Sequence, residues 1–117
     1  MSTLAPNLAA LVDMLKRRPL GSVDELRERV SQHLRVVTRQ QGRGREVDLG
    51  VARSTGQLCH QMLDRWETLD DPHRALVQAA CLYFVEAGDD EEDLDAGGFD
   101  DDLQIARWVA TRLADLP

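Results

Sequence analysis

Apolar residues recur at intervals of three or four positions along most of the chain, and this spacing predicts an all-α fold. The first predicted helix covers residues 6–18 and ends before Pro19. The second begins after Ser22, which together with Glu25 matches a capping box, and it ends at the glycine-containing stretch 40–46. The core-facing side of this helix is predicted from residues at helical spacing: Val23, Leu26, Val30, Leu34 and Val37.

Two further helices are predicted in the middle of the chain. The third begins at Asp48, a suitable N-cap residue, and ends near Leu69. Gly56 lies inside this helix and weakens it. Asp71 followed by Pro72 matches the N-cap and first turn of a fourth helix.

The fourth helix is apolar on nearly every side over residues 75–85, where Gln78 is the main exception. A helix of this kind is normally buried, so we expect it at the centre of a compact five-helix bundle. Because few residues join the third and fourth helices, we expect an antiparallel hairpin with Cys59 opposite Cys81. Both cysteines lie on apolar sides, which favours buried free thiols over zinc ligands.

Composition and length agree with a single globular domain. The chain has 117 residues, of which 43% are hydrophobic and 30% are charged. We expect no secretory signal in residues 1–20, because the basic residues there follow the apolar stretch. The longest apolar stretch is too short to span a bilayer, so we expect a cytoplasmic protein without membrane contact.

Charge is distributed very unevenly along the chain. Residues 86–102, which we call the acidic segment, contain ten of the 21 acidic residues and no Lys or Arg. The remainder has 14 basic residues against 11 acidic ones, although the whole chain has a net charge of −7. The sequence therefore predicts a mildly basic body with one anionic loop, followed by a fifth helix that Asp100 or Asp101 caps.

Clustered carboxylates repel one another and attract hard cations such as Ca²⁺ or Mg²⁺. The EF-hand pattern does not match, because a loop starting at Asp93 would place Asp100 at an apolar position and Gln104 at the final glutamate position. The alternative is a solvated loop whose last aspartates lie at the positive end of the fifth helix. If the loop binds a cation, we expect these ligands: Asp89, Asp93, Asp101 and Asp102.

The region from Tyr83 to Asp102 resembles the signature of the YkvA-like family, whose biochemical role is undefined. In that signature a tyrosine ends an apolar helix, an aspartate follows six residues later, and a Gly-x-x-Asp-Asp motif opens the next helix. Here Tyr83, Asp89, Asp93 and residues 98–102 match it, with Glu92 where the family has a proline. The resemblance implies a compact helical domain in which the matching aspartates organise a turn. Four acidic residues exceed what that turn requires, and we expect them to contact a partner: Asp90, Glu91, Glu92 and Asp95.

A group of arginines surrounds the loop between the second and third helices. A glycine-flanked arginine group can hold phosphate or a nucleic-acid backbone, but the anionic net charge and the lack of interleaved aromatic residues disfavour nucleic acid. The alternative is a solvated loop, or one that pairs with carboxylates of the same chain. The group consists of Arg35, Arg39, Arg43, Arg45 and Arg53.

No nucleophile–base pair is apparent from the sequence. We expect His33 at the boundary of the core and His73 in an exposed first turn, and neither position suggests a catalytic base.

The leading hypothesis is a non-enzymatic interaction or regulatory module of bacterial type whose acidic loop contacts a basic protein partner. The alternatives are a helical domain that binds Ca²⁺ or Mg²⁺ and an immunity protein or antitoxin, with a metal-dependent hydrolase ranked last. Homodimerisation through Trp66, Trp108 or an exposed stripe is also open.

Overall fold

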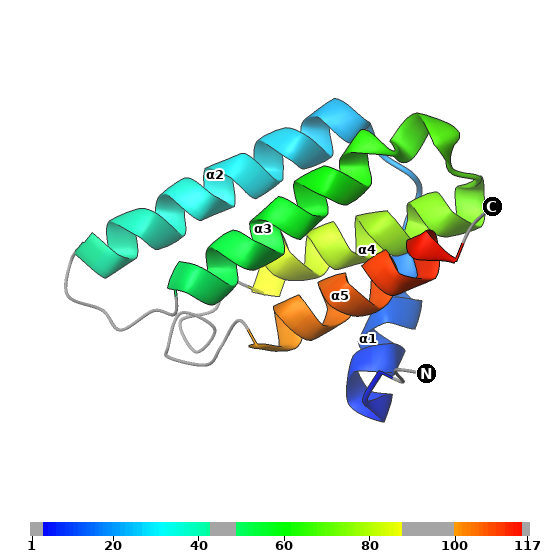
Figure 1. Ribbon diagram of the computed structural model, residues 1–117, viewed down its shortest axis with the longest axis horizontal. Helices are drawn as coiled ribbons and strands as arrows, with labels where there is room; N and C mark the ends of the chain where they lie inside the picture. The colour runs from blue at the N-terminus through cyan, green and yellow to red at the C-terminus, as the bar shows by residue number, and fades with distance from the viewer. Residues whose placement is uncertain (1–3, 43–48, 88–99, 116–117) are drawn as a thin grey trace.

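A computed structural model describes residues 4–42, 49–87 and 100–115, with the side chains of these residues except 40–42, 49, 87, 100 and 101. These residues form five α-helices and one 3₁₀ turn, with no strand among them: α1 (Pro6–Lys16), α2 (Val23–Gly42), α3 (Leu49–Asp64), η1 (Trp66–Thr68), α4 (Asp71–Ala87) and α5 (Asp100–Ala114). The predicted all-α five-helix fold is confirmed. Helices α2 to α5 lie side by side along the long axis of the molecule, and α1 is steeply inclined to them and packs against α4 and α5 (Figure 1).

Local signals set the starts of the first two helices. Pro6 is the first residue of α1, where its missing N–H costs no hydrogen bond. Ser22 precedes α2, and its Oγ accepts a hydrogen bond from the backbone N–H of Glu25 at 3.4 Å. A capping box has two hydrogen bonds, and this is the one in which the serine side chain accepts a hydrogen bond from the backbone.

The third helix ends earlier than predicted. Helix α3 ends at Asp64, and the chain continues through η1 instead of reaching Leu69 as a helix. Packing of Trp66 decides this, because its side chain is only 7% exposed and its carbonyl accepts a hydrogen bond from Arg74 Nε at 2.8 Å. Most of the Trp66 side chain therefore packs inside the protein.

The N-cap of α4 is Asp70, one residue before the predicted Asp71. The Asp70 carboxylate accepts a hydrogen bond from the backbone N–H of His73 at 3.1 Å, and its carbonyl accepts one from the N–H of Arg74 at 2.9 Å. The His73 ring contacts the same carboxylate, and this hydrogen bond, with the backbone one, lowers the pKa of Asp70. Asp71 is therefore the first helical residue.

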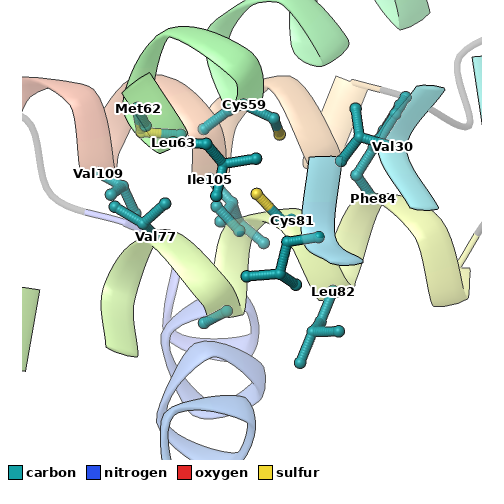
Figure 2. Packing of buried hydrophobic residues seen from close by; sticks show 14 of the residues in the cluster. Val30, Cys59, Met62, Leu63, Val77, Cys81, Leu82, Phe84, Ile105 and Val109 are labelled. Carbon is teal, nitrogen blue, oxygen red and sulfur yellow. The ribbon is translucent and has the colours of Figure 1, made fainter. Parts of the chain in front are cut away.

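Helix α4 occupies the centre of the bundle, as predicted. It packs against α1, α2, α3 and α5. Figure 2 shows its side chains among those of α2, α3 and α5. Its buried residues include Val77, Ala79, Ala80, Cys81, Leu82, Phe84 and Val85.

Gln78, the polar exception on α4, is also buried, with 3% of its surface exposed. Its side-chain Nε2 donates to the Pro19 carbonyl at 2.9 Å, and its Oε1 accepts from the Gly21 N–H at 2.8 Å. Gln78 thus replaces water for two backbone groups of the α1–α2 connection, which explains a polar residue at this position.

Candidate functional site

The four long helices bring two connections to the same end of the bundle. The C-terminal ends of α2 and α4 and the N-terminal ends of α3 and α5 all lie there (Figure 1). Seven of the eight acidic residues predicted as cation ligands or partner contacts have side chains outside those that the structure describes: Asp89, Asp90, Glu91, Glu92, Asp93, Asp95 and Asp101.

The acidic segment is attached to the body at both of its ends. Glu86 Oε1 accepts a hydrogen bond from Arg18 at 2.6 Å, and Arg29 lies 3.9 Å from the same atom. At the other end Asp102 is 2% exposed, and Ile105 follows it into the core. Four of the ten acidic residues therefore belong to helices, Glu86 to α4 and residues 100–102 to α5, and the other six lie between them in sequence.

Asp102 lies close to the two cysteines predicted at the same level of the α3–α4 hairpin. Cys59 and Cys81 are both free and fully buried, and Figure 2 shows their side chains on the facing helices α3 and α4. The hydrogen bond between the two thiols raises the pKa of Cys59 well above its usual value, and burial and the nearby Asp102 charge raise it further. A protonated thiol is a poor nucleophile, so this cluster has the character of a core contact.

Among the residues that the structure describes, no three His, Cys, Asp or Glu side chains are grouped so that they could hold a metal ion. His33, predicted at the core boundary, is buried edge-on against Phe84 with 4.8 Å between the ring centroids. His73 contacts Asp70 at the start of α4.

The structure brings Ser31 and His60 together, a pair that the sequence analysis missed. Ser31 Oγ lies 3.2 Å from His60 Nε2 across the interface between α2 and α3. A serine nucleophile needs a base that a third group orients, and no ion pair to His60 is found within the described part of the chain. The contact ties helices α2 and α3 together.

This pair belongs to a regular antiparallel interface between α2 and α3. Four residues before Ser31, Arg27 forms an ion pair of 2.7 Å with Asp64, which lies four residues after His60. In the other direction along α2, Leu34 packs at Gly56, where an added Cβ would lie only 2.6 Å from Leu34 Cδ1. Gly56 thus allows the two helices to approach closely, which explains a glycine inside α3.

The same interface ends in a cluster of arginines. Arg35 and Arg39 on α2 and Arg53 on α3 line one cavity of about 390 Å³, together with Leu34 and Thr38. The remaining members of the predicted arginine group, Arg43 and Arg45, lie outside the described residues. The sequence analysis placed Arg53 in this group, and the register of the helices brings it beside the pair on α2.

Within the described residues, no helix combines the length and apolar character that crossing a membrane requires. Comparison of the chain with models of known protein families, with curated protein sequences and with solved structures gives no match. The resemblance to the YkvA-like family therefore rests on the motif between Tyr83 and Asp102 alone.

Proposed function

We propose that this protein is a non-enzymatic regulatory module whose acidic segment contacts a basic surface on a protein partner. The observation that carries this proposal is the segregation of charge. Ten acidic residues and no basic residue occupy positions 86–102, while the rest of the chain has a surplus of basic residues. Such a segment accelerates association with a basic partner through long-range attraction.

The attachment of both ends of the acidic segment supports a role as a recognition element. Arg18 and Arg29 neutralise Glu86 at one end, and buried Asp102 belongs to the body at the other. The carboxylates between these two residues remain as the source of negative charge. A segment fixed at two points loses less conformational entropy on binding than a free tail does.

The experiment is affinity capture followed by quantitative binding. The protein is immobilised, partners are captured from a lysate at low salt and identified by mass spectrometry, and each purified partner is then measured for association rate against ionic strength. We expect a partner whose association slows as salt increases. The variant Asp90→Asn, Glu91→Gln, Glu92→Gln, Asp95→Asn should reduce the association rate about tenfold or more.

A charge-matched control separates the acidic segment from net charge. The variant Asp13→Asn, Asp24→Asn, Glu67→Gln, Asp115→Asn also removes four negative charges, from exposed positions on the body. It should leave association nearly unchanged. Equal loss in the two variants, or a partner that binds independently of salt, would contradict the proposal.

Melting measurements on the wild type and on a variant of Asp89 and Asp93 distinguish the cation-binding alternative. A cation that binds only the folded protein must raise the melting temperature. If Ca²⁺ or Mg²⁺ at millimolar concentration stabilises the protein, and substitution of Asp89 and Asp93 removes this effect, the acidic segment is a cation site. An unchanged melting temperature favours the partner-binding role.

A further inference from the structure

We propose that the cavity between Arg35, Arg39 and Arg53 binds the phosphate group of a small phosphorylated molecule. This inference is independent of the proposed function, because it concerns a different surface and the opposite charge. It rests on the register of α2 against α3, on the ion pairs that those helices form, and on the residues that line the cavity.

The register places positive charges together where opposite charges would stabilise the interface. At one end of the α2–α3 interface, Arg27 of α2 meets Asp64 of α3. At the other end the matching positions on α3 hold Arg53 instead of an acidic residue, and Arg53 shares a cavity with Arg35 and Arg39. Arg35 and Arg39 lie four residues apart on one helix, and like charges at this spacing repel one another. A bound anion would relieve this repulsion.

The partners of these arginines determine the charge that a ligand must bring. Arg35 has an exposed partner, Glu28, at 3.4 Å. Neither Arg39 nor Arg53 has an acidic partner among the residues that the structure describes. Two positive charges without an acidic partner in the described part of the chain match a phosphate monoester, whose charge is close to −2 at neutral pH, better than they match a carboxylate.

The hydrogen-bonding groups of the cavity also suit phosphate. Each guanidinium group presents five N–H donors in a planar fork that fits phosphate oxygens. The Thr38 hydroxyl donates to the Leu34 carbonyl at 2.8 Å, so its proton is already used within α2. The arginines are therefore the donors to the anion, while Leu34 offers an apolar surface beside them.

The size and net charge favour a small molecule over nucleic acid. The cavity of about 390 Å³ is widely open to solvent, so it suits the phosphate end of a small molecule. A long polyanion would also meet a protein with a net charge of −7, which opposes its approach, whereas a small anion needs only the local field.

The test is a titration followed by two-dimensional ¹H–¹⁵N NMR, with inorganic phosphate as the probe and sodium chloride adjusted to hold ionic strength constant. We expect saturable shifts of the Arg39 and Arg53 side-chain Nε–H signals, with a dissociation constant of about 1 mM or tighter. Adenosine monophosphate distinguishes a phosphate ester from free phosphate and should bind at least as tightly, since Leu34 lies beside the arginines. Acetate should bind about tenfold more weakly than phosphate.

Two charge-matched variants make the result specific. The double variant Arg39→Gln, Arg53→Gln should weaken phosphate binding about tenfold or more. The control double variant Arg17→Gln, Arg107→Gln should weaken it about twofold or less. All four residues are exposed, and circular dichroism checks that both variants fold. Shifts that do not saturate, equal loss in both variants, or a single-stranded oligonucleotide that binds more tightly than the mononucleotide would overturn the proposal.

Discussion

Gln78 and Gly21 are 57 residues apart in sequence, yet the Gly21 N–H donates a hydrogen bond of 2.8 Å to the Gln78 side chain. The same side chain donates to the Pro19 carbonyl, so one amide satisfies a donor and an acceptor in the connection between α1 and α2. Because α1 packs mainly on α4, this contact fixes the path by which the chain leaves α1 and enters α2.

Replacing Gln78 by Leu should destabilise the protein by about 1–3 kcal/mol, because both backbone groups lose their partner in a partly buried place. Chemical denaturation measures the free energy of unfolding. Gln61→Leu on the exposed side of α3 is the matched control and should change the stability by less than about 0.5 kcal/mol. Equal effects of the two changes would show that the contact to Gly21 contributes nothing.

Much of the fold could be predicted from periodicity, and the Gln78 contact shows where that method stops. The apolar stretch 75–85 indicated a central helix, since helix burial follows from the residues of the helix itself. The reason for Gln78 depended on a turn far away in sequence. In the same way, the end of α3 depended on the packing of Trp66 and on its hydrogen bond with Arg74. No glycine or proline in the sequence marks this helix end.

The candidate sites were predictable to different degrees. The acidic segment is a feature of composition and needs no structure to be found. The arginine cavity joins residues from two helices, so it needs the register that Gly56 and Leu34 help to set. The Ser31–His60 contact follows from the same register and has no local sequence signal.

Asp70→Ala should destabilise the protein more than Asp71→Ala, because Asp70 is the N-cap of α4 and Asp71 is the first helical residue. Thermal melting of the two variants tests this. The lowered pKa of Asp70 means that its carboxylate stabilises the folded state above the unfolded pKa of about 3.9. The difference between wild type and Asp70→Ala should therefore diminish as the pH falls below that value. A larger effect of Asp71→Ala would restore the boundary predicted from sequence.

Gly56→Ala should destabilise the protein although alanine normally stabilises a helix by about 0.5–1 kcal/mol relative to glycine. The added Cβ would lie 2.6 Å from Leu34 Cδ1 and 3.1 Å from Leu34 Cγ, so the Leu34 side chain must move. We expect a net loss of about 1 kcal/mol. In a Leu34→Ala background the clash is absent, and the same change should become stabilising. A double-mutant cycle by urea denaturation measures the coupling, and additive effects would contradict close packing at this point.

The raised pKa of Cys59 predicts a loss of stability in alkaline solution. The folded protein holds the Cys59 proton more tightly than the unfolded chain does, so this stabilisation is fully present below the unfolded pKa of about 8.5. Above that pH the unfolded chain loses its proton first, and the free energy of unfolding should fall by up to about 1.4 kcal/mol per pH unit.

Urea denaturation between pH 7 and pH 10 under reducing conditions measures this slope. Cys59→Ala removes the group and should make the profile flatter, whereas Cys81→Ala removes the largest cause of the shift and should have an intermediate effect. Profiles of equal slope in wild type and Cys59→Ala would show that other groups control the alkaline limb, and that the Cys59–Cys81 contact has no role in it.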